Sequence, residues 1–286
     1  MKKKLILLFI SSIVLSAYSQ DQRKAFVDSL LNGVEIKKDI QYNISGKPLH
    51  LDIYYPQKTT EKQLPCVVWI HGGGLTDTTI KKDYDLIRWG IARTTPKGYI
   101  CVSIDYSLIQ ESPLPKAIID CETAIRFIKS HAIEYKIDTT RIAVVGESSG
   151  GYLAGFCSFA CDSAIFTIKE WNQVTNKVTC GVLWYPTIHQ SPNYNMIDFI
   201  SAGDIPVTSI HGEVDHIVPL NQSYQIQKKC KEKGVSFKLN IIKGADHGFY
   251  DKEWKFNEAN KRYMEQAINI TIDYLNDHLK IVSGSN

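Results

Sequence analysis

Short, uninterrupted apolar runs recur along the chain, and each ends at a glycine or another turn-forming residue. Residues 66–70 (CVVWI) lead directly into 71–74 (HGGG), and residues 142–145 (IAVV) lead into Gly146. A strand that is apolar at every position has both faces covered, as the central strands of a parallel sheet do. These runs therefore predict a sheet packed between two layers of helices.

Strand-like and helix-like segments alternate over most of the chain. Further strands are expected at 35–42, 48–55, 99–104, 181–185, 206–210 and 237–242, the first two joined as a hairpin by the turn at 45–47. Helices are expected at 115–135, 151–161, 219–233 and 258–279, and apolar residues recur with helical spacing in the first of them. The alternation predicts an α/β fold with a mostly parallel sheet and helices on both faces.

The chain of 286 residues, 44% of them hydrophobic and 22% charged, suits one globular domain. It contains no internal repeat and no low-complexity linker, so residues 21–286 are expected to form a single domain. Residues 162–177 and 187–204 fit the alternation badly. We interpret both segments as excursions over the top of the sheet, where substrate specificity often resides.

Residues 1–20 have the composition of a secretory signal peptide. Three lysines at 2–4 precede an apolar run at 5–15, and small residues follow at 16–20. The apolar run is too short to span a bilayer comfortably, although an uncleaved N-terminal anchor is the alternative. No cysteine stands at the expected cut, which disfavours a lipoprotein. We expect export to the periplasm or the medium, with no stable membrane span after cleavage.

Net charge gives no sign of a nucleic acid or membrane partner. Removal of the three leader lysines leaves 30 basic and 30 acidic residues, so the mature chain is formally neutral. A strongly basic surface would be needed to attract a polyanion. We expect no nucleic acid partner, and the sequence leaves the oligomeric state open.

Seven cysteines remain in the mature chain, and an odd number leaves at least one thiol unpaired within a monomer. Several lie in apolar runs, where cysteine behaves as a small hydrophobic residue. No pair of CxxC motifs and no matching histidine spacing occurs, so we expect no metal site. The sequence does not assign any disulfide pairing.

Residues 146–150 (GESSG) match the G-x-S-x-G pattern with Ser148 at its centre. A predicted strand precedes the serine and a helix-compatible stretch follows it, which is the context of a nucleophile elbow. Glycines at 146 and 150 leave room for a strained turn and for close packing of strand and helix. Ser148 is therefore the candidate nucleophile rather than Ser149.

A serine nucleophile needs a base to take its proton and an acid to orient that base. Residues 206–210 lead into a loop that contains Asp215, and residues 237–242 lead into a loop that contains His247. Both loops follow predicted strands on the same sheet edge as Ser148, and their order along the chain is serine, acid, histidine. Asp215 and His247 are the candidate acid and base. The rival bases are His189, His211 and His216, and the rival acids are Glu213 and Asp246.

The glycines at 72–74 follow the first buried strand, where an oxyanion loop of the HGGG type is expected. Glycine lets backbone N–H groups face a developing oxyanion without an intervening side chain. Gly73 and Gly74 are the candidate donors, together with the backbone N–H of Ser149. Trp184 and Tyr185 end a strand on the same edge, where they are candidates either for substrate binding or for the core.

Taken together, these motifs resemble the α/β-hydrolase superfamily, and within it the esterases related to hormone-sensitive lipase and to bacterial feruloyl esterases. The residues that carry the resemblance are 71–74 (HGGG), 105–106 (DY), 146–150 (GESSG), 211–219 (HGEVDHIVP) and 244–249 (GADHGF). The resemblance extends over residues 34–279. It implies an eight-stranded sheet, a catalytic domain at 21–286, ester hydrolysis through a covalent acyl-enzyme, and no cofactor.

Some positions depart from the lipase branch. Ser107-Leu108 follow Asp105-Tyr106 where many relatives have Arg-Leu, so Asp105 is a structural support without an assigned partner. The glutamate in GESSG and the short stretch before residue 34 favour the acetyl- or feruloyl-esterase side. We expect short-chain acyl or feruloyl esters, some of them borne on plant polysaccharide. A prolyl-oligopeptidase-type exopeptidase and a non-catalytic binding protein on the same scaffold are the alternatives.

Overall fold

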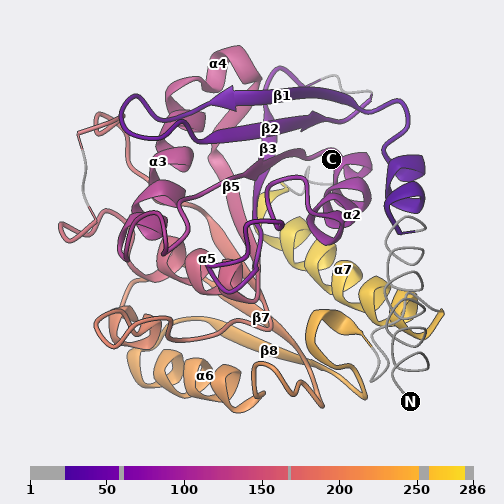
Figure 1. Ribbon diagram of the computed structural model, residues 1–286, viewed down its shortest axis with the longest axis vertical. Helices are drawn as coiled ribbons and strands as arrows, with labels where there is room; N and C mark the ends of the chain where they lie inside the picture. Colours follow the sequence, from indigo (N-terminus) through magenta and orange to yellow (C-terminus); the bar gives the residue numbers. More distant parts are fainter. Residues whose placement is uncertain (1–22, 58–60, 167–168, 251–257, 281–286) are drawn as a thin grey trace, which may run out of the picture.

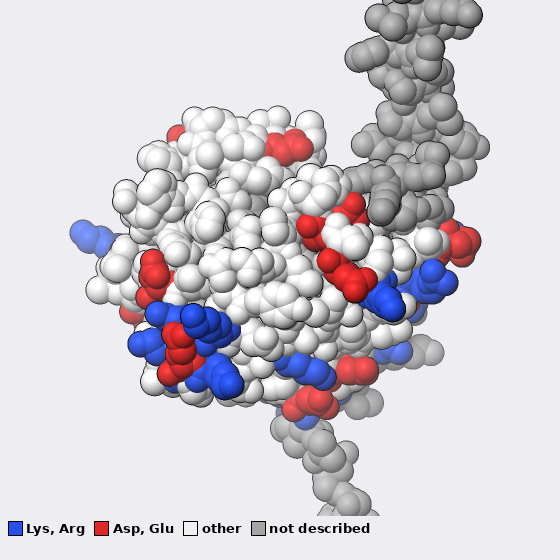
Figure 2. All heavy atoms as spheres, turned by 90° about the horizontal axis from the view of Figure 1, so that it is seen from below, with Lys and Arg blue, Asp and Glu red and all other residues white. Residues whose placement is uncertain are grey.

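The computed structural model describes residues 23–57, 61–166, 169–250 and 258–280 (Figure 1). The expected signal peptide lies outside these residues. Within the described part of the chain, no helix is long and apolar enough to cross a membrane. On the face seen in Figure 2, acidic and basic side chains lie beside one another along the lower half rather than in separate patches of one sign.

The centre of the fold is an eight-stranded sheet. Its strands are β1 (Glu35–Gln41), β2 (His50–Tyr55), β3 (Leu64–Ile70), β4 (Ile100–Ile104), β5 (Ile137–Glu147), β6 (Cys180–Trp184), β7 (Val207–Gly212) and β8 (Phe237–Ile242), in the order β1-β2-β4-β3-β5-β6-β7-β8. β2 pairs antiparallel with β1 and β4, and the remaining neighbours are parallel. The predicted fold class is confirmed, including the hairpin at the start of the sheet.

Helices cover both faces of the sheet. They are α2 (Asp85–Thr94), α3 (Lys116–Ser130), α4 (Ala132–Tyr135), α5 (Ser149–Phe159), α6 (Asn221–Lys233) and α7 (Glu258–Leu279), with 3-10 turns η1 (Thr95–Lys97), η2 (Met196–Phe199) and η3 (His247–Phe249). A further helical segment lies at residues 23–30. The predicted helices are confirmed, whereas α2 and the segment at 23–30 were not predicted from the sequence.

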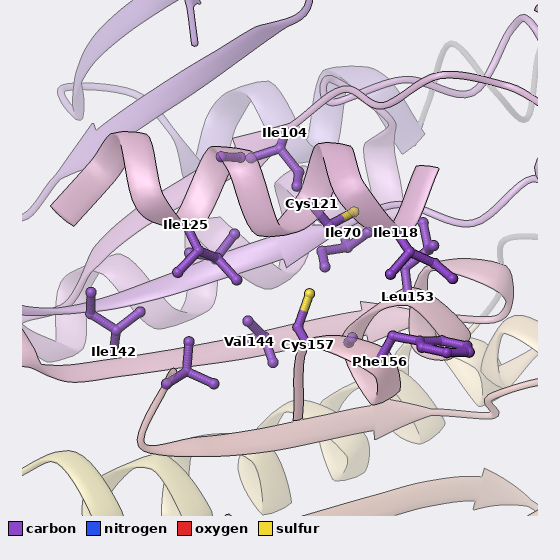
Figure 3. Packing of buried hydrophobic residues seen from close by; sticks show 14 of the residues in the cluster. Ile70, Ile104, Ile118, Cys121, Ile125, Ile142, Val144, Leu153, Phe156 and Cys157 are labelled. Carbon is purple, nitrogen blue, oxygen red and sulfur yellow. The ribbon is translucent and has the colours of Figure 1, made fainter. Parts of the chain in front are cut away.

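Each face of the sheet has its own hydrophobic core. On one face, α3 and α5 pack over β3 and β5, with Cys121 of α3 directed toward Cys157 of α5 (Figure 3). On the other face, α2, α7 and the helical segment at 23–30 surround Trp69 and Trp184, whose rings meet edge to face at 5.5 Å. Because both faces are covered, the central strands are apolar along their whole length.

The missed helix α2 contains Gly90, a residue that disfavours helix formation in isolation. A Cβ at this position would lie 2.6 Å from the ring of Trp69, so the glycine lets α2 pack closely on β3. The need for glycine at this position arises from tertiary packing. The spacing of residues along the sequence therefore gives no sign of it.

Cysteine acts as a core residue here. All seven thiols are unpaired, and six of them are buried. Burial raises the pKa of Cys101 and Cys180 to about 12, so both remain protonated and unreactive at neutral pH.

The two excursions pack against the fold instead of extending from it. Residues 187–204 contain η2, and its Met196 lies directly against Gly155 of α5. In the segment 162–177, the Trp171 indole donates a hydrogen bond to the carbonyl of Tyr42 at 2.9 Å and packs on Phe127. Both segments are therefore anchored to the core on the α3–α5 face.

A buried carboxyl on α3 gives a prediction about stability. Glu122 is 2% exposed, neither of its oxygens makes a hydrogen bond in the described part of the chain, and burial raises its pKa to about 8. The unfolded carboxyl ionises at the ordinary pKa of 4.5 while the folded one stays protonated. The free energy of unfolding therefore falls as pH rises from 4.5 to 8, by about 4 kcal/mol at the upper end.

We expect Glu122→Gln to raise the melting temperature relative to the wild type at pH 8, with the difference shrinking toward pH 4.5. Thermal unfolding followed by circular dichroism across this pH range measures the effect. A difference that stays constant with pH would contradict this assignment of the buried carboxyl.

Candidate active site

The turn after β5 holds Ser148 in a strained backbone conformation. Its φ is 56° and its ψ is −118°, a region that side-chain-bearing residues rarely adopt outside functional sites. Its backbone N–H donates to the carbonyl of Trp184 at 2.9 Å, and α5 begins at the next residue. The strain presents the Ser148 hydroxyl, which is partly exposed, above the C-terminal edge of the sheet.

The glycines that flank Ser148 are required by close backbone contacts. A Cβ at Gly146 would lie 2.1 Å from the carbonyl oxygen of Gly150, and a Cβ at Gly150 would lie 2.2 Å from the carbonyl oxygen of Ile70. The start of α5 thus sits directly on the ends of β5 and β3. The G-x-S-x-G pattern follows from this packing.

The structure brings Ser148, Asp215 and His247 together. His247 Nε2 lies 3.1 Å from Ser148 Oγ, and His247 Nδ1–H donates to Asp215 Oδ2 at 2.8 Å. The three residues come from loops after β5, β7 and β8, whose parallel C-terminal ends meet at one edge. The serine is aligned to give its proton to the imidazole, and the carboxylate fixes the ring orientation.

Asp215 is held as a carboxylate by several donors. Its Oδ1 accepts the backbone N–H groups of Ile217 and Val218 at 3.0 and 2.7 Å, and its Oδ2 lies 3.3 Å from His211 Nε2. Burial alone would raise the pKa of this carboxyl, but the hydrogen bonds from His211 and His247 hold it well below the usual range. Asp215 therefore stays ionised and accepts from His247.

The rival bases have other partners. His211 is fully buried, with its Nε2–H donating to the carbonyl of Val218 and its Nδ1 lying 2.8 Å from Ser223 Oγ. His216 Nδ1 lies 2.6 Å from Asp246 Oδ2, and that carboxylate also caps the backbone N–H of His247 at 2.7 Å. Of the rival acids, Asp246 thus supports the histidine loop from its outer side.

The remaining rivals are explained by local contacts. Glu213 accepts the backbone N–H of Gly244 at 2.9 Å, which ties the acid loop to the histidine loop. His189 lies in the 187–204 excursion, where it forms an isolated bridge with Asn195 and lines a shallow surface hollow. Neither residue makes a hydrogen bond to Ser148 or His247 in the part of the chain described.

The predicted oxyanion donors belong to the loop that follows β3 and to the first residue of α5. Gly73 and Gly74 have φ values of +94° and +63°, which glycine adopts without strain, and both are accessible to solvent. Ser149 is the first residue of α5, where backbone N–H groups have no helical acceptor. Among the described residues, none of these three N–H groups makes a backbone hydrogen bond, so none of them is already engaged by a backbone acceptor.

The loop at 71–74 is supported from below by Tyr106. Its hydroxyl donates to the carbonyls of His71 and Gly72 at 2.8 and 2.9 Å, and its ring stacks on His71 at 4.3 Å. Burial lowers the pKa of His71 to about 4, so its imidazole is neutral at working pH. Asp105 finds its partner in the backbone N–H of Lys82 at 2.9 Å.

Of the two alternatives for Trp184 and Tyr185, substrate binding or the core, the structure places both residues in the core, because both side chains are fully buried. The Trp184 indole donates to Thr271 Oγ1 of α7 at 2.9 Å, on the core side of the sheet. The Tyr185 ring packs edge to face on His247 at 4.6 Å and supports the base from behind. A strand-end position alone does not reveal toward which side an aromatic ring turns.

Glu147, the residue before the nucleophile, was not among the site residues predicted from the sequence. Its carboxyl oxygens accept the backbone N–H of Gly72 at 2.6 Å and the hydroxyl of Tyr185 at 3.1 Å. A cavity of about 260 Å³ adjoins the oxyanion loop on its other side. Its lining combines apolar residues such as Leu49, Ile80 and Leu108 with the polar or charged residues Lys47, His50, His71, Lys81, Asp105 and Glu111.

An eight-stranded, mostly parallel sheet that carries a serine, a histidine and a carboxylate at its C-terminal edge is the arrangement of the α/β-hydrolase fold. A family model described as BD-FAE matches residues 51–189. The chain is 32% identical over 152 residues to "Esterase LipI" and 30% identical over 155 residues to "Carboxylesterase NlhH", both from Mycobacterium tuberculosis. These matches cover 52% and 54% of this chain and 43% and 44% of the relatives, so the match spans less than half the length of either relative.

Solved structures agree on the fold. An esterase from Thermogutta terrifontis superposes with a TM-score of 0.73 at 20% identity, covering 89% of this chain and 96% of that one. A truncated carbohydrate esterase from gut microbiota superposes with a TM-score of 0.67 at 21% identity, covering 82% and 96%. The resemblance to the serine esterases of the α/β-hydrolase superfamily, including the hormone-sensitive-lipase-like group, is confirmed by these comparisons.

Because His247 and His216 have different partners, substitutions at the two positions should have different effects on catalysis. We expect His247→Asn to lower kcat for an activated ester by at least about 10⁴-fold, because the Ser148 hydroxyl loses its base. The matched change His216→Asn is expected to lower kcat by less than about fivefold, because the His216 side chain is 55% exposed and contacts Asp246 rather than Ser148. Steady-state kinetics on 4-nitrophenyl acetate compares the two variants, and equal losses would refute this assignment of the base.

Proposed function

We propose that the protein is an exported serine carboxylesterase that hydrolyses short-chain acyl or feruloyl esters, including esters borne on plant polysaccharide. The observation that carries the proposal is the hydrogen-bonded series Ser148–His247–Asp215 beside backbone N–H groups with no backbone acceptor. The named esterases and carboxylesterases among its relatives support the same reaction.

In the acylation half-reaction, Ser148 Oγ attacks the ester carbonyl carbon while its proton moves to His247 Nε2. The carbonyl oxygen becomes an oxyanion that accepts hydrogen bonds from the N–H groups of Gly73, Gly74 and Ser149. When the bond to the alcohol oxygen breaks, His247 transfers its proton to that oxygen. The alcohol leaves, and the acyl group remains on the serine.

Deacylation repeats these steps with water. His247 Nε2 takes a proton from the water molecule as it attacks the acyl carbon, and the same N–H groups stabilise the second oxyanion. The proton then returns to Ser148 Oγ as the carboxylic acid departs. Asp215 stays ionised throughout and stabilises the imidazolium that forms in both halves.

Three observations support a short or polar substrate. The helical segment at 23–30 buries Val27 in the core beside α2 and α7, and Phe26 and Leu30 pack against the same core, which leaves little apolar surface to cover a long acyl chain. The cavity beside the oxyanion loop carries the charged side chains of Lys47, Lys81, Asp105 and Glu111 among its apolar residues, and such groups suit a sugar hydroxyl better than a lipid. Two structural neighbours are a carbohydrate esterase and a bifunctional GH43-CE protein from Bacteroides eggerthii.

A panel of esters tests the reaction and the acyl group. We expect the purified protein to hydrolyse 4-nitrophenyl acetate or methyl ferulate with a higher kcat/KM than 4-nitrophenyl octanoate. Ser148→Ala is expected to lower kcat at least about 10³-fold, because no other group can form the acyl-enzyme. Ser149→Ala is the matched control, because its backbone N–H is retained. Turnover of aminoacyl-nitroanilides but not of esters would overturn the proposal in favour of an exopeptidase.

Export has its own test. Expression with the intact leader in a Gram-negative host should release a protein that begins near residue 21 into the periplasm, because Lys2–Lys4 and the apolar run form a cleavable signal. N-terminal sequencing of the periplasmic fraction identifies the cut. An uncleaved chain in the membrane fraction would instead indicate an anchor.

A further inference from the structure

Glu147 is a buried carboxyl directly before the nucleophile. The residue is 5% exposed, and burial raises the pKa of its side chain even though the N–H of Gly72, the charge of His247 and the hydroxyl of Tyr185 act in the opposite direction. A buried carboxyl costs stability unless its oxygens are hydrogen-bonded. Both oxygens of Glu147 have partners, and these partners belong to opposite halves of the active site.

One oxygen holds the oxyanion loop. Glu147 Oε1 accepts the backbone N–H of Gly72 at 2.6 Å, a short contact between the end of β5 and the loop that follows β3. A Cβ at Gly72 would lie 2.6 Å from the same oxygen, so the carboxyl occupies the space that a side chain would need. The N–H groups of Gly73 and Gly74 follow immediately, and their direction depends on how Gly72 is held.

The other oxygen supports the base through Tyr185. Glu147 Oε2 accepts the Tyr185 hydroxyl at 3.1 Å, and the Tyr185 ring packs edge to face on His247 with an angle of 62° between the rings. The same ring contacts Phe249 at 4.8 Å, within the histidine loop. Because Glu147 holds its hydroxyl, the Tyr185 ring keeps a fixed position against the His247 imidazole.

We propose that Glu147 is a positioning residue that fixes the oxyanion loop through Gly72 and the His247 ring through Tyr185, relative to the serine next to it. One side chain on β5 thus sets the spacing between the nucleophile, the oxyanion donors and the base. This inference rests on the proposed esterase function, because it assigns Glu147 a role in that reaction.

Positioning by hydrogen bonds predicts a specific pattern of substitutions. Glutamine has the same shape, and its amide oxygen can accept from Gly72 while its NH₂ group donates to the Tyr185 oxygen. Alanine removes both contacts, and aspartate is one methylene too short to make them together. Loss of one oxyanion donor lowers kcat by about 10²–10³-fold, so misdirected donors are expected to cost roughly 10- to 100-fold.

The experiment compares kcat and KM on 4-nitrophenyl acetate for Glu147→Gln, Glu147→Asp, Glu147→Ala and Tyr185→Phe. We expect Glu147→Gln to stay within about threefold of the wild type, and the alanine and aspartate variants to lose roughly 10- to 100-fold in kcat with KM nearly unchanged. Tyr185→Phe breaks only the arm to His247 and is expected to fall between them. Glu122→Gln, a change at a buried carboxyl on α3, is the control and should keep wild-type kcat.

Hydrogen–deuterium exchange on the same proteins measures how firmly Glu147 holds the backbone N–H of Gly72, independently of catalytic activity. We call this hydrogen bond the anchor. The peptide that contains Gly72 should exchange faster in the alanine and aspartate variants than in the wild type, and at the wild-type rate in Glu147→Gln and Tyr185→Phe. If Glu147→Ala does not fold, the aspartate variant makes the same comparison. A wild type that hydrolyses no ester would refute the proposed function and leave the exchange measurement as the test of the anchor.

Two results would overturn the inference. The first is a folded alanine or aspartate variant with wild-type kcat or unchanged exchange at Gly72. The second is a glutamine variant as impaired as the alanine variant, which would mean that the charge of Glu147 matters and that its hydrogen bonds do not.

Discussion

The close approach of the start of α5 to the ends of β3 and β5 is the contact on which the active site depends. Gly150 lies so near the carbonyl of Ile70 that no side chain fits, and Gly146 lies equally near Gly150. This contact forces the strained turn at Ser148 and brings the loop after β3 beside it. Six adjacent parallel strands then bring the acid and histidine loops to the same edge, because their C-terminal ends point one way.

At this edge of the sheet, a few buried side chains hold the active-site loops through hydrogen bonds. Tyr106 holds the oxyanion loop by its carbonyls, Glu147 holds it by an N–H, and Asp215 gathers two backbone donors and two histidines. Each would be costly to bury alone, and each is stabilised by partners that also define the site geometry. The structural support and the proposed chemistry therefore share the same hydrogen bonds.

The fold was largely predictable because its signals are local. Apolar runs marked the strands, and the order of serine, acid and histidine loops along the chain matched the order of strand ends. The candidate residues Ser148, Asp215 and His247 were named from that order, and they lie within hydrogen-bonding distance. Helix α2 was missed because its glycine is favourable only against Trp69, a contact that local spacing does not contain.

By itself, the sequence determined the α/β class, the strand ends that carry the candidate residues, and the glycines that a tight turn requires. Tertiary structure alone decided which way the buried side chains face: Tyr185 toward His247, Trp184 toward α7, and Glu147 toward Gly72. The physical reason is that strand periodicity specifies a side of the sheet but not a partner. A partner is selected only when segments distant in sequence are packed together, because leaving a buried polar atom without a hydrogen bond costs free energy.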